Sequence, residues 1–256
     1  MKDGRLDIPQ FYLTAPDKCP YLPDQEERKL FAHLSGPMAI DVNDRLNLAG
    51  FRRSQTVAYR PACEDCKACR SLRVLADEFK PSRNERRVLA RNRDVQVHSF
   101  PAQATAEQFE LFRHYLETRH ADAGMDDMDQ ADFMAMLENS SVDTQITEYR
   151  LLPTDRIPKG RLIGAALCDE LFDGQSMVYS FFDPDESERS LGTYMILERI
   201  LAMQAHHMPH LYLGYSIEEC QKMAYKTRFM PHELYIDGDW CRHDTKPATK
   251  NTDDPQ

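Results

Sequence analysis

The chain has 256 residues, of which 41% are hydrophobic and 29% are charged. No apolar run approaches the roughly 20 residues that a membrane-spanning helix needs, and the N-terminal stretch lacks the apolar centre of a secretory signal. We therefore expect a cytoplasmic protein without a membrane partner. Its seven cysteines then favour reduced thiols or metal ligands over a disulfide framework.

Charge is unevenly distributed along the chain. The formal net charge is −10, yet residues 50–93 hold twelve Lys or Arg and five Asp or Glu. This segment therefore carries +7 and the rest of the chain −17. Such segregation predicts one face that attracts an anion, although a solvated basic helix with no partner explains the charge run equally well.

The first half of the chain combines strand patterns with one basic helix. Residues 11–75 are rich in strands and loops, with β-type segments at 49–59 and 71–75. Ser82 and Glu85 form a capping box, which predicts a helix over residues 82–93. Arginines recur there every four residues along one side, at Arg83, Arg87 and Arg91.

The second half predicts an α+β arrangement. Thr105 and Gln108 form another capping box, for a helix that reaches about residue 119. Asp173 and Gly174 join two strand patterns as a hairpin, and Gly214 interrupts a later strand, as a bulge or a close ligand would require. Strands are expected at residues 147–152, 162–172, 177–182 and 211–215. Helices are expected at residues 133–137, 193–206 and 217–225.

The stretch SFFDPDESERSLGTY, residues 180–194, runs from a strand through a turn into a helix. Backbone N–H groups at a helix start hold phosphates, and the turn resembles the acyl-CoA motif of GNAT acyltransferases at Arg189 and Gly192. Tyr194 stands where that motif has a small residue, and we expect its ring to crowd a pyrophosphate. A helix start that merely needs a flexible turn is the alternative.

Two further groups of residues suggest binding sites. Cys63, Cys66 and Cys69 are spaced by two residues, which suits a soft metal ion with Cys19 as the fourth ligand. Reduced structural thiols are the alternative. In GFRRSQTVAYRP, residues 50–61, strand alternation sends Arg52 and Arg53 to opposite faces, so that one can hold a carboxylate or phosphate in a cleft.

Several motifs in a fixed order resemble one family. They are CPYLP, AGFRRSQTVAYRPAC, CRSLRV, SFFDPD, SLGTY and YLGYSIEECQKMAYK. Together they span about residues 11–240 and resemble the bacterial aminoacyl-tRNA–protein transferases, most closely the aspartate/glutamate leucyltransferase branch, which is related to the eukaryotic arginyl-tRNA–protein transferases. The resemblance implies transfer of leucine from leucyl-tRNA to the N-terminal α-amine of proteins that begin with Asp or Glu, a step in N-degron protein degradation.

The resemblance also implies a domain plan. An N-terminal α+β domain with the cysteine cluster is expected over residues 1–75. A GNAT-like transferase domain that includes the basic helix is expected over residues 76–240, and a disordered tail over residues 241–256. The donated amino acid, leucine or arginine, cannot be chosen from the residues themselves.

An aminoacyl ester is already activated, so the enzyme has to align amine and ester, stabilise an oxyanion and return a proton. For the proton the candidates are Asp183 and Tyr215. For the 3′ end of the tRNA they are Tyr179, Ser190, Leu191, Gly192 and Thr193. For the acidic side chain of the acceptor they are Arg52, Arg53 and Arg73, with Lys226 in reserve. For the tRNA backbone they are Arg83, Arg87 and Arg91.

The cysteines depart from the eukaryotic pattern, because Leu22 and Lys67 stand where that branch has cysteines. We therefore expect no obligatory cofactor, and leave open zinc or an Fe–S cluster at Cys19, Cys63, Cys66 and Cys69. Two other functions remain. One is an acetyl-CoA-dependent GNAT acyltransferase, which Tyr194 and the basic segment disfavour. The other is a non-catalytic RNA- or zinc-binding adaptor, which the acyltransferase-like order of the second half disfavours.

Overall fold

The N-terminal part of the computed structural model, which describes residues 9–119 and 128–244, is a small antiparallel sheet. Its strand order is β1 (Phe11–Leu13), β4 (Lys29–His33), β6 (Val57–Pro61) and β5 (Arg52–Ser54). A short ribbon of β2 (Asp17–Lys18) and β3 (Glu26–Glu27) and helix α1 (Ala39–Leu48) accompany it. We did not predict α1, which has no side-chain cap at its start and buries two asparagines.

The rest of the chain builds an eight-stranded sheet in the order β14-β13-β7-β12-β11-β10-β9-β8. Its strands are β7 (Arg70–Leu75), β8 (Val95–Pro101), β9 (Thr144–Leu151), β10 (Leu162–Leu171), β11 (Gly174–Phe182), β12 (His210–Ser216), β13 (His232–Ile236) and β14 (Asp239–His243). Only β11 and β12 pair in parallel, because the chain crosses between them through η2 (Pro184–Arg189) and helix α5 (Leu191–Ala205).

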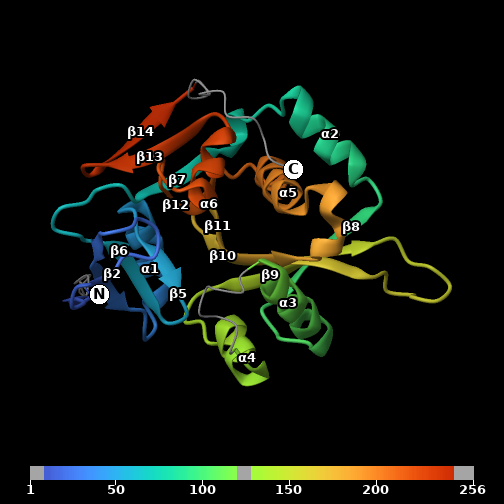
Figure 1. The fold of residues 1–256 in the computed structure, drawn as a ribbon, viewed down its shortest axis with the longest axis horizontal. Helices are drawn as coiled ribbons and strands as arrows, with labels where there is room; N and C mark the ends of the chain where they lie inside the picture. The colour runs from blue at the N-terminus through green and yellow to red at the C-terminus, as the bar shows by residue number, and fades with distance from the viewer. Residues whose placement is uncertain (1–8, 120–127, 245–256) are drawn as a thin grey trace, which may run out of the picture.

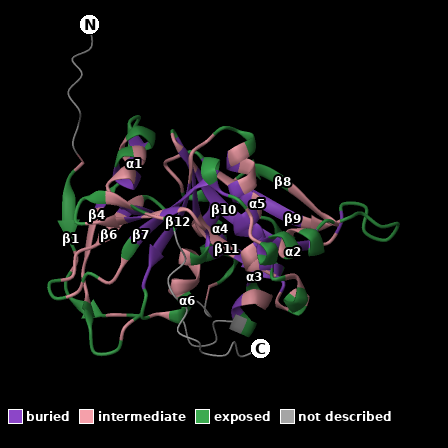
Figure 2. Cartoon of the chain, turned by 90° about the horizontal axis from the view of Figure 1, so that it is seen from above, coloured by how far each residue is buried: buried purple, intermediate pink, exposed green. Residues whose placement is uncertain are grey.

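Helices cover both faces of this sheet. Helices α2 (Arg83–Arg91) and α5 lie on one face, and α3 (Ala106–Arg119) and α4 (Gln130–Glu138) lie on the other (Figure 1). Two apolar clusters fill the two interfaces, one around α5 and one around α3 and α4. Ten-residue β10 is buried along almost its whole length between them (Figure 2). Within the described ranges, no helix is both long and apolar enough to cross a bilayer.

The observed fold is α+β, as predicted, and both capping boxes are confirmed, at Ser82 with Glu85 and at Thr105 with Gln108. The hairpin at Gly174 is also confirmed. The expected helix over residues 217–225 is wrong: a four-residue helix, α6 (Gln221–Ala224), runs into the 3₁₀ turn η3 (Tyr225–Arg228). Another short 3₁₀ turn, η1 (Ala76–Glu78), follows β7.

The expected domain limits fall inside the large sheet. Strand β7 already belongs to that sheet, so the chain leaves the small sheet between β6 and β7, before residue 75. Residues 241–243 pair with β13 as part of β14. The remainder of the expected tail, from residue 245, lies outside the described residues, as do residues 120–127 of the acidic loop.

The parallel pair β11 and β12 is short. Pairing covers only Gly174–Ser176 and His210–Tyr212. Beyond it, β11 is irregular against β10 at Val178, and β12 is irregular against β7 at Leu213. Such bulges bend a strand and end its pairing. Beyond these residues β11 and β12 no longer pair with each other, although β11 still pairs with β10 and β12 with β7. We call residues 177–182 of β11 and 213–216 of β12 the strand fork.

A side chain from the small sheet enters the fork. The Arg52 guanidinium donates from Nη1 to Ser176 Oγ at 2.8 Å and from Nη2 to the Met177 carbonyl. Gly214 accommodates it, because a Cβ at that position would lie 3.1 Å from Arg52 Nε, and its φ of +80° favours glycine. Arg52 thus binds backbone and side-chain groups at the point where the ladder between β11 and β12 stops.

The neighbouring Arg53 makes a separate link between the two sheets. Its Nε and Nη2 atoms donate to the two carboxylate oxygens of Asp169 at 2.6 and 2.7 Å, and both side chains are almost completely buried. Thr144 donates to the same carboxylate at 2.8 Å. Strand alternation therefore separates Arg52 and Arg53 as expected, but both point into the molecule.

Replacing Asp169 by Asn should destabilise the protein by about 3 kcal/mol or more, because Arg53 would remain buried without a counter-charge. The measurement is the free energy of unfolding in urea. Glu64→Gln is the control, since Glu64 pairs with Arg28 at an exposed position and should cost under about 1 kcal/mol. Equal losses for the two variants would contradict the assigned importance of the Arg53–Asp169 pair.

Gly214→Ala should be more destabilising than Gly36→Ala. Both glycines have positive φ, but a Cβ at Gly36 meets nothing within 4 Å whereas one at Gly214 meets Arg52. The backbone strain common to both is about 1–2 kcal/mol. The additional loss at Gly214 should disappear in an Arg52→Ala background. Equal losses in the free energy of unfolding for Gly214→Ala and Gly36→Ala would show that Arg52 does not require the absence of a side chain at position 214.

Candidate active site at the strand fork

A lysine from η3 lies at the free end of β12. Lys226 Nζ donates to the Tyr215 carbonyl at 2.8 Å and contacts Met223 sulfur at 3.4 Å. Burial, and then the positive charge of Arg52, lower the pKa of Lys226 to about 7. The side chain therefore changes charge near neutral pH.

Arg52 and Lys226 share an unusual feature: neither has a carboxylate partner within ion-pair distance among the described residues. Arg52 is only 5% exposed, and Lys226 is partly buried. Buried cations in proteins are normally paired with anions. The two side chains together form a positively charged position at the fork that an anionic group would stabilise.

The other two cations expected to hold an acidic side chain already have partners. Arg53 is bound to Asp169, as described above. Arg73 donates from Nε to Glu233 at 2.7 Å, lies 3.7 Å from Asp173, and has its guanidinium 4.3 Å from the Trp240 ring centre. Of the four candidates, Arg52 and Lys226 are thus the two without a carboxylate partner in residues 9–119 and 128–244.

Tyr215, a candidate for proton transfer, has its hydroxyl directed into the interface with the small sheet. It lies 2.9 Å from the Tyr59 carbonyl and 3.2 Å from the Gly50 carbonyl, to which it donates. Burial raises the pKa of Tyr215 far above its usual value. Through these hydrogen bonds the Tyr215 side chain links β12 to the small sheet.

The start of α5 is the predicted phosphate turn. Ser190 has a left-handed φ of +54°, and α5 begins at the next residue. The first backbone N–H groups of a helix have no partner within it, and those of Leu191, Gly192 and Thr193 occupy that position here. The Leu191 side chain itself is buried in the core.

One expectation about this turn needs correction. Tyr194 does not crowd the helix start, because its ring packs in the core against Tyr149, with ring centres 5.9 Å apart. Arg189, at which the turn resembles the acyl-CoA motif, donates to both oxygens of Asp94 at 2.8 Å and to Glu186 at 2.7 Å. The helical periodicity of α5 turns Tyr194 toward the core. The carboxylates of Asp94 and Glu186 fix the orientation of Arg189.

The basic helix α2 ends beside the same turn. The Arg91 guanidinium donates to the Glu188 carbonyl, and the Asn92 side chain donates to the Arg189 carbonyl at 2.9 Å. Arg83 and Arg87 are exposed on the same helix. The C-terminal end of α2 is therefore hydrogen-bonded to the turn that precedes α5.

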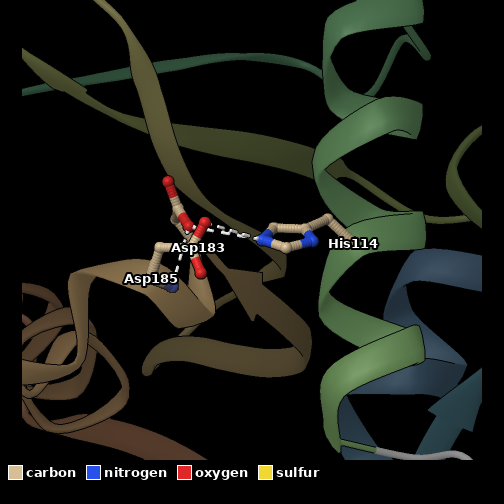
Figure 3. A group of neighbouring side chains, drawn as sticks. All are labelled: His114, Asp183 and Asp185. Carbon is tan, nitrogen blue, oxygen red and sulfur yellow. Dashed lines mark hydrogen bonds and ion pairs between the residues drawn. The ribbon is translucent and has the colours of Figure 1, made fainter.

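Asp183 lies where β11 ends, and it belongs to a cluster with His114 of α3 and Asp185 of η2 (Figure 3). The His114 Nε2 atom is 3.1 Å from Asp185 and 3.8 Å from Asp183. Asp183 also pairs with Arg161 and accepts from the Asp185 N–H at 3.0 Å. His114 lies 69 positions before Asp183 in the chain, and no sequence pattern connects the two.

This cluster is the one group of three candidate metal ligands found among the described residues. Its donor set does not fit a cation well, because Arg161 already neutralises Asp183 and would repel a metal ion. No chemical step is therefore assigned to a metal there.

The four cysteines line a common cavity of about 570 Å³ between the small sheet and β13. Within the described ranges, no three of their sulfurs lie within 4.8 Å of one another, whereas a tetrahedral zinc site brings them closer. Burial, with neighbouring thiols, raises the pKa of Cys69 to about 12. As arranged here, Cys19, Cys63, Cys66 and Cys69 are free cysteines and do not form a closed ligand set.

Known proteins resemble this chain over nearly its whole length. An aspartate/glutamate leucyltransferase from Nitrobacter hamburgensis is 53% identical over 253 residues, which cover 98% of each chain. One from Rhizobium meliloti is 53% identical over 250 residues, covering 94% of this chain and 96% of the relative.

Similarity to solved structures is weak. FemX gives a TM-score of 0.44 at 12% identity and covers 68% of this chain and 59% of its own. L-PGS from Bacillus licheniformis gives a TM-score of 0.44 at 10% identity and covers 59% of this chain and 46% of its own.

Two family models match in chain order. The model described as "Arginine-tRNA-protein transferase, N terminus" matches residues 17–87, and the one described as "Arginine-tRNA-protein transferase, C terminus" matches residues 107–236. The matched segments include Arg52, the turn before α5 and Lys226. The chain therefore belongs to the arginine-tRNA-protein transferase family of aminoacyltransferases.

Proposed function

We propose that this protein transfers leucine from leucyl-tRNA to the N-terminal α-amine of proteins that begin with Asp or Glu. The observation that carries the proposal is the carboxylate-free cation pair, Arg52 and Lys226, at a fork beside the N-terminus of α5. The names of the relatives, aspartate/glutamate leucyltransferase, support the same donor and acceptors. Charged tRNA places this reaction in the cytoplasm.

The acceptor would bind through its acidic side chain. Lys226 is partly accessible and would contact the carboxylate, while Arg52 lies deeper and would contribute its positive charge from the interior. Arg53 and Arg73 would act indirectly, since each already holds a carboxylate of the protein. Asn and Gln lack the negative charge that this position stabilises, so they should be poor acceptors.

The donor would lie along α2 and α5. Arg83, Arg87 and Arg91 would contact phosphates of the acceptor stem, which orients an RNA without reading its sequence. The 3′ end would then reach the start of α5 and Tyr179 on β11. The N-terminal unit, which ends with β6, would supply Arg52. The transferase unit, which begins with β7, would supply the other groups.

In the reaction the neutral α-amine attacks the ester carbonyl, and the resulting tetrahedral oxyanion needs hydrogen-bond donors. The free N–H groups at the start of α5 would supply them. The C–O bond to the ribose then breaks, and the proton lost by the amine returns to the departing hydroxyl. We assign this proton transfer to Asp183 with His114, because the Tyr215 hydroxyl is bound to backbone carbonyls.

Incubation with a peptide that begins with Asp should give a leucine-sized mass gain from leucyl-tRNA. Treating the donor with RNase should abolish the gain, and a peptide that differs only by Asn at the first position should remain unmodified. Arginyl-tRNA and acetyl-CoA are the competing donors. Transfer of arginine or acetyl in place of leucine would overturn the proposed donor, and modification of the Asn peptide at an equal rate would overturn the cation pair as its selector.

The charge of Lys226 should make acceptor recognition depend on pH. Lys226 is protonated below pH 7 and loses its charge above it, whereas an arginine at that position stays charged. The ratio of kcat/KM for the wild type to that for Lys226→Arg should therefore fall as pH rises through about 7. The α-amines of the acceptor and of the aminoacyl ester titrate equally with both proteins, so their contributions cancel.

Lys222→Arg is the matched control, since Lys222 is exposed on the adjoining α6, and its ratio should not change with pH. Lys226→Met should lower kcat/KM for the Asp peptide about 30-fold or more, as truncation of one member of a buried charge pair does. A ratio for Lys226→Arg that is constant from pH 6 to 9 would contradict this role.

A further inference from the structure

Three tyrosines from distant parts of the chain meet at the fork. Tyr115 of α3 packs on Phe182 with ring centres 5.1 Å apart, and Tyr179 of β11 packs on Phe112 at 6.1 Å. Tyr225 of η3 precedes Lys226. Tyr115 is an electrostatic neighbour of both others and, after burial, contributes to the raised pKa of each.

The hydroxyls of Tyr179 and Tyr225 differ from those of other buried tyrosines. Tyr149 donates to Glu198 and Tyr212 donates to Asp173, but the hydroxyls of Tyr179 and Tyr225 make no hydrogen bond to any part of the chain that the structure describes. Both residues are only partly exposed. Neither hydroxyl is enclosed by the protein, so each can exchange a hydrogen bond with the polar atoms of a ligand.

The position of these rings suggests what that ligand is. Tyr225 adjoins Lys226, where the acceptor would bind, and Tyr115 packs on Phe182, whose ring lies 3.2 Å from the place of a Cβ on Gly192 at the start of α5. The rings therefore lie between the positions proposed above for the acceptor and for the 3′ end of the donor.

We propose that Tyr115, Tyr179 and Tyr225 bind the 3′-terminal adenosine of the donor tRNA, with ring faces against the base and hydroxyls on its polar edge or ribose. This proposal rests on the proposed function. Base–aromatic stacking is worth about 1–3 kcal/mol per base. The leucyl side chain is the less suitable occupant, because an apolar group would leave the two hydroxyls unsatisfied.

Calorimetric titration of the protein with the trinucleotide CCA and the dinucleotide CC tests this without any transfer reaction. CCA should bind about 5- to 100-fold more tightly, which corresponds to one stacked base. Tyr225→Leu and Tyr179→Leu should remove most of this difference. Tyr225→Phe should keep most of it, because the ring remains.

Tyr12→Leu is the control, since Tyr12 lies exposed on β1 of the small sheet and should not alter the difference. Thermal unfolding followed by circular dichroism would show that each variant is folded. Equal binding of CCA and CC to the wild type, or a difference that persists in both leucine variants, would overturn the adenosine site. So would binding of leucinol that Tyr225→Leu abolishes, which would place the leucyl side chain there.

The two proposals can fail separately. Leucine transfer with equal affinity for CCA and CC would reject the adenosine site and leave the proposed function intact. A tyrosine-dependent preference for CCA without leucine transfer to the Asp peptide would retain the adenosine site and reject the donor or acceptor assigned to the enzyme.

Discussion

The Arg52 guanidinium between β11 and β12 is the contact on which the candidate active site depends. It binds Ser176 and the Met177 carbonyl where the parallel ladder stops, and Gly214 leaves the space that it occupies. Burial lowers the pKa of Lys226, and the charge of Arg52 lowers it further. One side chain from the small sheet therefore joins the two units, occupies the base of the fork and contributes to the lowered pKa of the neighbouring lysine.

Ion pairing divides the cations of this protein into structural and available ones. Arg53, Arg73, Arg161 and Arg189 each hold one or more carboxylates. The pairs around η2 fix the turn from which α5 starts, while the exposed arginines of α2 remain free to meet a polyanion. This division explains how a chain with a net charge of −10 keeps exposed arginines on α2 that have no carboxylate partner among the described residues.

Local signals predicted local structure well. Both capping boxes and the hairpin at Gly174 depend on residues within a few positions of one another, and all three form as expected. Helix α1 lacks a side-chain cap and was missed, and the helix expected over residues 217–225 breaks into two short turns. Tyr179 and Asp183 were named from the sequence, but His114, Tyr115 and Tyr225 could not be found from it, since they come from α3 and η3, far from β11 in the chain.

The sequence by itself determined the family, the α+β class and the set of chemical groups available, because ordered motifs and short-range patterns are written along the chain. Only the tertiary structure decided which of those groups remain free. Arg52, Arg53 and Arg73 are equivalent as sequence, but Arg53 meets Asp169 across 116 positions and Arg73 meets Glu233 across 160. The partner of a charge is fixed by sheet packing between distant segments, and among the described residues that packing brings no carboxylate to Arg52 or Lys226.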